Sequence, residues 1–108
     1  MFLNLRNSDL YRASLRKSSL TGADLSSHGI GKWGMPIQTN LGKTNFSGAT
    51  LKRANLSGAD FQGANFKAAN LKRADLSNPD GGRFSFSWQS SGGGAFFVNA
   101  NLRRANSF

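Results

Sequence analysis

The chain has 108 residues, which is enough for one small domain, and we expect residues 1–108 to form a single domain. It has no cysteine, which excludes disulfides and thiolate nucleophiles, and its mean hydropathy of −0.42 comes with no apolar run long enough to cross a membrane. Fourteen Lys and Arg against five Asp give a net charge of +9, which favours an acidic protein, nucleic acid or anionic lipid as partner.

The N-terminal segment, residues 3–27, carries a large apolar residue at every fifth position. Its first residues lack the long apolar stretch of a signal peptide, so we expect a soluble chain without one. Five residues turn an α-helix to another face, and in a strand an odd spacing changes face. The pattern instead requires a chain that turns by a fixed angle at each repeat, as in a solenoid. These large residues, called centres below, are Leu5, Leu10, Leu15, Leu20 and Leu25.

The other positions of the repeat predict the surroundings of each centre. Small residues stand two places before it, so large and small side chains alternate in a narrow interior, and Asn or Asp usually stands just before it. These polar side chains suit hydrogen bonds to the local backbone at corners. Two places after the centre, Gly22 and Gly58 indicate a tight turn. Because other repeats have Arg or Lys there, we expect that the turn does not require a positive φ.

Residues 27–38 interrupt the repeat. The next centre, Leu41, follows Leu25 by 16 residues, one more than three repeats. The segment is either a coil with one extra residue, forming a bulge, or a loop excluded from the wall, and the bulge is the favoured interpretation. We expect its apolar residues, including Trp33 and Ile37, to cover the wall.

The pattern resumes over residues 39–78 and resembles the pentapeptide-repeat family, whose repeat is A-(D/N)-L-x-x. The resemblance covers 3–27 and 39–78, and partly 95–107. It implies an all-β solenoid, a right-handed quadrilateral β-helix of about five coils with irregular insertions at 27–38 and 78–97; the period alone also permits a triangle. Four sides predict that residues 20 apart stack. The predicted stacks are Phe46 on Phe66, Leu51 on Leu71, Leu56 on Leu76 and Asn45 on Asn65.

Residues 78–97 interrupt the repeat again, because 21 residues separate Leu76 from Phe97. A bulged coil and an excluded loop both fit this spacing. Phe84, Phe86 and Trp88 alternate as in a strand with one aromatic face. A cap over an open end of the solenoid, a protein-binding patch and a base-stacking surface are the three interpretations.

Paired cations follow several centres. If residues 27–38 are a bulged coil, Arg12, Lys32, Lys52-Arg53 and Lys72-Arg73 form a stripe on one side of the solenoid, with Arg103-Arg104 on a neighbouring side. Lys52-Arg53 and Lys72-Arg73 stack however the interruption is resolved. The stripe either keeps the wall solvated or contacts an anionic partner.

No motif for catalysis, a metal or a cofactor is present, and His28 has no second histidine or glutamate to support it as a base. Four of the aspartates occupy the repeat's own Asn/Asp position, so we expect no enzyme, no cofactor and no metal site. The leading hypothesis is a protein-interaction scaffold, such as an accessory subunit of a larger assembly. The alternative is binding of nucleic acid or another anionic surface through the stripe.

The resemblance adds two further expectations. Some members of the family resemble acidic duplex DNA and bind gyrase, but a charge of +9 has the wrong sign for this mimicry, which we disfavour. The family is abundant in cyanobacteria and occurs in plastids, which suggests a photosynthetic host.

Overall fold

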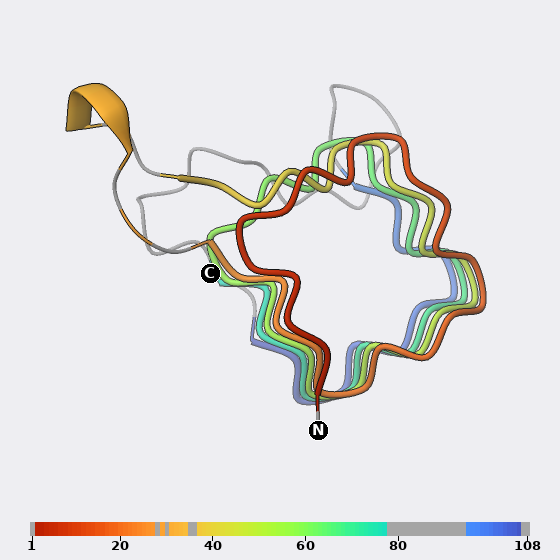
Figure 1. The fold of residues 1–108 in the computed structure, drawn as a ribbon. Helices are drawn as coiled ribbons and strands as arrows, with labels where there is room; N and C mark the ends of the chain where they lie inside the picture. Colours follow the sequence, from red (N-terminus) through yellow and green to blue (C-terminus); the bar gives the residue numbers. More distant parts are fainter. Residues whose placement is uncertain (1, 28, 30, 35–36, 78–94, 107–108) are drawn as a thin grey trace.

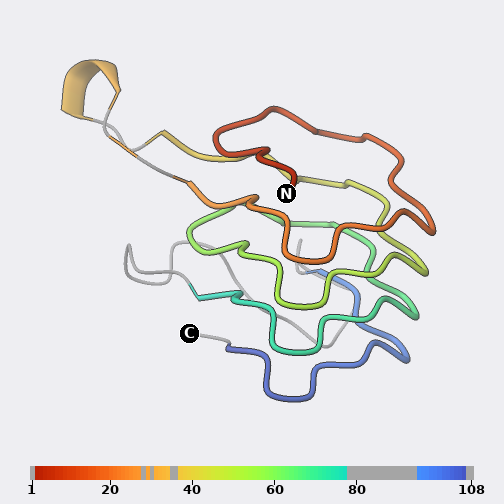
Figure 2. The same ribbon diagram turned by 60° about the horizontal axis from the view of Figure 1, so that its bottom comes forward.

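The chain winds as a stack of coils around one axis. The structure is a computed structural model that describes residues 2–27, 29, 31–34, 37–77 and 95–106. Isolated parallel bridges, one per repeat, join each coil to the next, and where the repeat is uninterrupted they join residues 20 apart, such as Asn45 and Asn65. Twenty residues are four repeats, so each coil has four sides, as the view along the axis shows (Figure 1). Figure 2 shows the same coils one above another.

Each side of the solenoid is a stack of repeats, each with a centre and the two outward residues that follow it. Backbone N–H groups of the centres donate to carbonyls of the next coil, at 2.6 to 2.8 Å, and these bonds define the stacks. The first side contains Leu5, Leu25, Leu56 and Leu76; the second contains Leu10, Leu41 and Phe61; the third contains Leu15, Phe46, Phe66 and Phe97; and the fourth contains Leu20, Leu51, Leu71 and Leu102.

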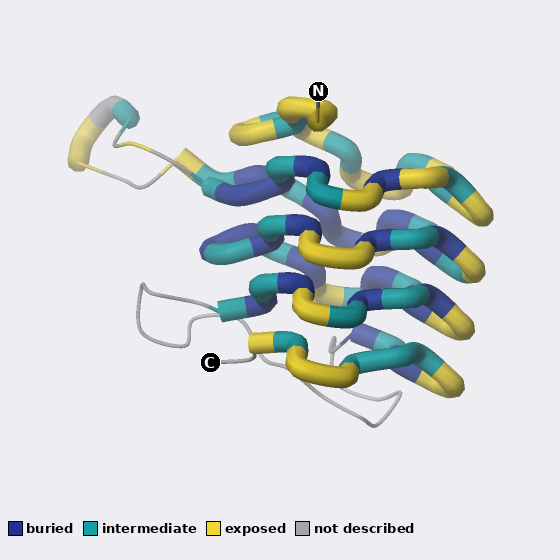
Figure 3. Tube along the Cα trace, turned by 90° about the horizontal axis from the view of Figure 1, so that it is seen from below, coloured by how far each residue is buried: buried dark blue, intermediate teal, exposed yellow. Residues whose placement is uncertain are grey.

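The core is the column of centres and small residues inside the coils. The predicted stack of Phe46 on Phe66 is confirmed: the two rings are nearly parallel and their centroids lie 4.9 Å apart. Phe97 extends the stack, with its ring centroid 4.9 Å from that of Phe66. The predicted pairs of leucines 20 apart also stack, because Leu51 and Leu56 bond to Asn70 and Asp75, the residues just before Leu71 and Leu76. Burial is deepest in the middle coils, and the centres of the first coil are only half-buried, apart from Leu20 (Figure 3).

Tight turns connect the sides, and their geometry corrects the expectation about φ. The N–H three residues after a centre donates to the carbonyl of that centre, as from Ala54 to Leu51. In the described repeats other than that of Leu25, where the loop begins, the residue two after the centre has a positive φ whether it is glycine or not: φ is 60° at Arg53 and 62° at Arg73. Positive φ at only the third of four turn residues is the type II turn. Positive φ is therefore required here, and cationic residues adopt it.

Where Asn or Asp stands before a centre, its side chain makes the predicted local bond. The side-chain oxygen of Asn55, for example, accepts from the backbone N–H of Ser57 at 3.0 Å, and the same Asx turn recurs on all four sides. Such a bond gives the backbone N–H of the residue after the centre a side-chain acceptor at the corner.

The expectation that residues 27–38 form a bulged coil is wrong. Asp9 bridges Asn40, 31 residues later, whereas the regular spacing is 20. The next side therefore begins at Thr39, and residues 28–38 are eleven residues in excess of the repeat; the described ones (29, 31–34, 37 and 38) form a loop outside the wall. Its described part includes the 3₁₀ helix η1 (Lys32–Gly34), which projects away from the coils (Figures 1 and 2).

The second interruption has the same excess of eleven residues, because Asn65 bridges Phe96, 31 residues later. Of residues 78–97, Ala95 and Phe97 are buried and Phe96 is half-buried in the wall, and residues 78–94 lie outside the described residues. The first side reaches five levels, at Asn4, Asp24, Asn55, Asp75 and Asn106.

Candidate interaction surfaces

Three Lys/Arg pairs form a column on the fourth side. Backbone bonds fix their register: the N–H of Arg53 donates to the carbonyl of Lys72, and that of Arg73 to the carbonyl of Arg103, both at 2.9 Å. Each pair occupies the two outward positions of a turn, so its side chains leave the wall. This cation column consists of Lys52, Arg53, Lys72, Arg73, Arg103 and Arg104.

The structure changes the membership of the predicted stripe. Lys52-Arg53 and Lys72-Arg73 stack as predicted, and Arg103-Arg104 join them instead of lying on a neighbouring side. Thr21 and Gly22 take the corresponding places in the first coil, since the N–H of Gly22 donates to the carbonyl of Lys52 at 2.8 Å. Arg12 and Lys32 do not belong to the column: Arg12 lies on the second side, and Lys32 begins η1 in the loop.

The spacing of the repeats assigns Arg103-Arg104 to the wrong side, because it does not tell how many sides the two interruptions span. The residue type at the centres was the signal that could have placed them: aromatic Phe46, Phe66 and Phe97 form one stack, and the repeat after each of these continues on the fourth side.

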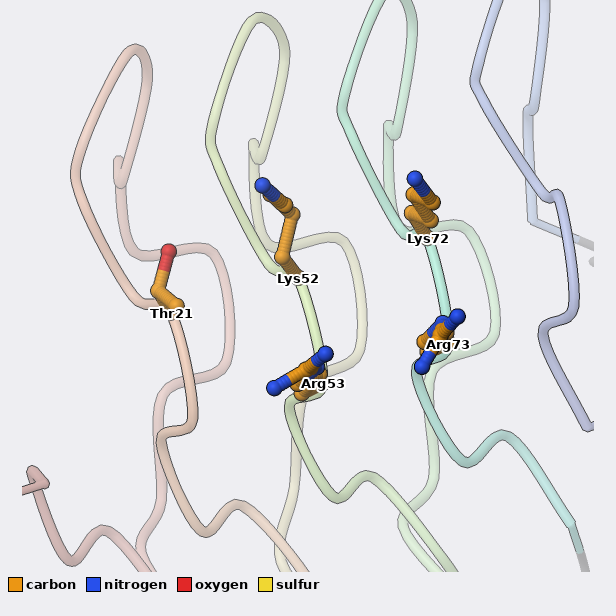
Figure 4. A pocket seen from close by; sticks show the side chains of 5 residues that line it. All are labelled: Thr21, Lys52, Arg53, Lys72 and Arg73. Atoms are coloured by element: carbon orange, nitrogen blue, oxygen red, sulfur yellow. The ribbon is translucent and has the colours of Figure 1, made fainter.

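A shallow groove of about 270 Å³ lies along the column, lined by Thr21, Lys52, Arg53, Lys72 and Arg73. The two lysines extend in parallel from successive coils, and so do the two arginines (Figure 4). Any anion in this groove meets four positive charges and one hydroxyl.

Charge is divided between two halves of the solenoid. The third side carries Arg16, Lys17 and Lys67. Together with the six residues of the cation column, the third and fourth sides therefore carry nine cations. None of their described repeats contains a carboxylate. The first and second sides carry three cations and four carboxylates, and the ion pair between Arg6 and Asp24, at 3.9 Å, lies on the first side.

Arg12 makes a local contact on the second side. Its Cζ lies 5.4 Å from the centroid of the Tyr11 ring. A hydrogen bond from Arg12, assisted by the positive charge of Lys43, lowers the pKa of the Tyr11 phenol below its ordinary value of 10.0.

The loop at residues 28–38 is the second candidate surface. Trp33, at its tip, is 93% exposed and has a φ of 63°, so the expectation that it covers the wall is wrong. Ile37 is also exposed. The loop is closed at its base, where the N–H of Ile37 donates to the carbonyl of Gly29 at 3.1 Å and that of Thr39 donates to Oγ of Ser27 at 2.8 Å.

The predicted aromatic patch, Phe84, Phe86 and Trp88, lies outside the described residues, as does His28. Among the described residues, no cluster of three or more His, Cys, Asp or Glu side chains could hold a metal ion. No helix in the described part of the chain has the length and apolarity needed to cross a bilayer.

The fold is shared with solved pentapeptide repeat proteins. One is alr5209 from Nostoc PCC 7120, with 25% sequence identity and a TM-score of 0.55 over 96% of this chain and 64% of that one. Another is Rfr23 from the cyanobacterium Cyanothece 51142, with 28% identity and a TM-score of 0.42 over 97% of this chain and 56% of that one. The chain therefore spans less than two thirds of the length of either protein. No curated protein matches it.

These proteins are right-handed quadrilateral β-helices, in agreement with the four-sided coil seen here. The first of them, alr5209, comes from a cyanobacterium, which fits the expected photosynthetic host. The family model for pentapeptide repeats matches eight copies, at residues 3–27 and 39–78. The chain belongs to the pentapeptide-repeat family.

Proposed function

We propose that the chain is a non-catalytic scaffold that binds another protein through the loop at residues 28–38. The observation that carries this proposal is Trp33, a large aromatic side chain that is 93% exposed at the tip of a loop projecting from the wall. An exposed indole leaves much apolar surface in water, and Trp is enriched among the residues that contribute most to protein interfaces. The role involves no chemical step.

The attachment of the loop supports this role. Thr39 lies at the base and donates through Oγ1 to the carbonyl of Ser26 at 2.8 Å, and Ser27 donates through Oγ to the carbonyl of Gly58 at 2.9 Å. These bonds tie both ends of the loop to the wall. The loop is therefore presented from a regular support, which reduces the entropy lost when a partner orders it.

The charge of the walls argues against DNA mimicry as the role. A mimic of duplex DNA must present a continuous negative surface, whereas the third and fourth sides carry nine cations and no carboxylate in their described repeats. The four carboxylates of the first and second sides share those sides with three cations, Arg6, Arg12 and Lys43.

Affinity purification from host cells, quantified by mass spectrometry, tests the proposed role. The wild type is compared with Trp33→Ala and with a deletion of residues 28–38. We expect at least one protein to be retained by the wild type and lost from both variants, and the purified pair to lose at least about 2 kcal/mol of binding free energy on Trp33→Ala. Identical sets of proteins on all three baits contradict the proposal.

A further inference from the structure

We propose that the cation column on the fourth side binds the phosphate backbone of a nucleic-acid duplex without reading its sequence. This site is separate from the loop. The four sides follow one another around the coil, and the loop leaves between the first and second sides. The cation-rich third and fourth sides therefore meet at the diagonally opposite corner (Figure 1).

The first argument is the fixed spacing of the column. Backbone bonds hold Arg53 and Arg73 one coil apart, and the stacked rings inside the wall give that spacing as 4.9 Å. Three pairs in succession make a straight row of about 10 Å between the outer turns, before the reach of the side chains is added. A row of this length faces two or three successive phosphates of one strand of a duplex.

The second argument is the absence of counter-charges. No carboxylate lies in the described repeats of the third and fourth sides, so nothing there offsets the repulsion among nine cations. Like charges directly opposite one another on neighbouring strands are destabilising. Keeping the wall solvated does not require so many cations close together. A bound polyanion, by contrast, neutralises these cations and removes the repulsion among them.

The third argument is the character of the outward residues, which distinguishes a duplex from other anionic partners. On the fourth side, neither the two positions after a centre nor the one before it holds an aromatic or large apolar residue. Besides the six cations, these positions include the polar residues Thr21, Thr50, Asn70 and Asn101. Protein interfaces contain an apolar core, and single strands bind by stacking bases on aromatic rings. Contacts to a duplex backbone are polar and strongly cationic.

The asparagines of the fourth side add neutral donors to the column. Oδ1 of Asn70 accepts from the N–H of Lys72, and Oδ1 of Asn101 accepts from that of Arg103, both at 3.1 Å. Because the oxygen of each amide faces the backbone, its NH₂ group is directed away from that contact. Such groups commonly donate to phosphate oxygens alongside Arg and Lys.

The experiment uses variants that remove charge without disturbing the fold. In Arg53→Gly/Arg73→Gly, both substitutions fall at positive φ, where glycine is favoured and where the first coil already has Gly22. The matched control, Arg12→Gly/Lys43→Gly, removes the same charge from the same turn position on the second side. Circular dichroism checks that both variants are folded.

Fluorescence anisotropy then measures binding to a labelled DNA duplex of about two helical turns, and to an RNA duplex of equal length, from about 50 to 200 mM salt. We expect the wild type to bind both, with a slope of log K against log salt of about −2 to −3, because two or three phosphates face the column. Arg53→Gly/Arg73→Gly is expected to weaken binding at least about tenfold at low salt and to reduce the magnitude of that slope by about 1 or more. Scrambling the base sequence leaves the affinity unchanged.

Three results overturn the proposal. They are the absence of binding at about 50 mM salt, an equal loss in the Arg12→Gly/Lys43→Gly control, and competition by poly-glutamate or phosphatidylserine vesicles as effective as that by unlabelled duplex at equal charge. The last result assigns the column to an acidic protein or a membrane surface instead. Deletion of residues 28–38 is expected to leave duplex binding intact, so the loop and the column are tested independently.

Discussion

Leu56 has no exposed surface and lies in the middle of the first side, between the levels of Leu25 and Leu76. Leu56→Asp places an ionised carboxylate among apolar side chains with no partner, which costs more than a domain of this size has in reserve. We expect the variant to be unfolded, and circular dichroism with thermal melting checks this. Leu3→Asp, at a position that is 53% exposed, is the control and should keep a cooperative transition. A cooperative, soluble Leu56→Asp variant contradicts the assigned interior.

The neighbours Ala68 and Ala69 separate the two effects of a glycine substitution. Ala68 is exposed with a φ of 58°, and Ala69 is buried. Ala68→Gly relieves a left-handed conformation that costs an alanine roughly 1–2 kcal/mol, and it adds flexibility worth about 0.5–1 kcal/mol to the unfolded chain. We expect a net gain of about 0.5 kcal/mol or more, and for Ala69→Gly a loss of about 1 kcal/mol. Urea unfolding measures both; destabilisation of similar size at the two positions contradicts the turn geometry.

Tyr11 reports on its surroundings directly, because it is the only tyrosine in the chain. A hydrogen bond from Arg12 lowers the pKa of the phenol below 10.0. A lowered folded-state pKa stabilises the fold at pH values above the unfolded pKa, and this contribution is lost as the pH falls through the folded pKa. Tyrosinate absorbance during an alkaline titration should show the lowered midpoint, and Arg12→Gly should move it upward. An unchanged midpoint in that variant excludes Arg12 as the cause.

The residue types predicted the interior well but the turns poorly. Large centres and small partners, such as Phe66 and Ala64, follow from a period of five, because a narrow coil has room for only that alternation. The left-handed turns were missed at Arg53 and Arg73 because intrinsic preference assigns positive φ to glycine. Hydrogen bonding to both adjacent coils overrides that preference, and such tertiary bonds leave no local signature in the sequence.

At the scale of elements, the loop at residues 28–38 is an insertion into an otherwise complete repeat. Its removal joins Ser27 to Thr39 and gives the sequence Leu-Ser-Ser-Thr-Asn-Leu from Leu25 to Leu41, which has the regular repeat spacing. The hydrogen bond between Ser27 and Thr39 shows that the ends to be joined are already adjacent.

We therefore expect the deletion of residues 28–38 to keep the fold, with a free energy of unfolding equal to or above that of the wild type, because a shorter connection costs less closure entropy. Urea unfolding measures this value. Deletion of 45–55, a stretch of equal length within the wall, is the control and should abolish cooperative unfolding. A deletion of 28–38 that unfolds the protein contradicts the exclusion of this segment from the coil.

The register across the interruptions could not be obtained from spacing. Gaps of 16 and 21 residues each exceed a multiple of five by one, which suggests whole repeats with a single extra residue. In the structure the first gap is instead one repeat with eleven additional residues, and across the second the bridged residues Asn65 and Phe96 are again eleven residues farther apart than the regular 20. An excess of one residue and an excess of eleven differ by two whole repeats, so the spacing cannot tell them apart. Only the pairing between coils, such as that of Asp9 with Asn40, distinguishes them. For the same reason two of the six cations of the column were placed on another side.

For the whole molecule, the division of charge predicts how salt acts on stability. Successive pairs of the cation column are held at the coil spacing, and repulsion between them exists in the folded state but is weaker in the more expanded unfolded chain. Mobile ions screen exposed charges, with a Debye length that falls from about 10 Å at 0.1 M to about 3 Å at 1 M. Added NaCl should therefore stabilise the protein, by a total on the order of 1 kcal/mol for several pairs that each repel by a few tenths.

Unfolding by urea, which is uncharged, at increasing NaCl concentrations measures this effect. Arg53→Gly/Arg73→Gly removes two cations of the column, so it should gain less stability from added NaCl than the wild type. Glycine at a positive φ raises stability at any salt concentration, in this variant and in the control alike, so the change with salt and not the urea midpoint itself measures the repulsion. Arg12→Gly/Lys43→Gly removes two cations from a side that also carries carboxylates, so its response to salt should stay close to that of the wild type. An equal salt response in the wild type and both variants means that the repulsion is spread over the whole surface, because only a localised repulsion distinguishes one side from another.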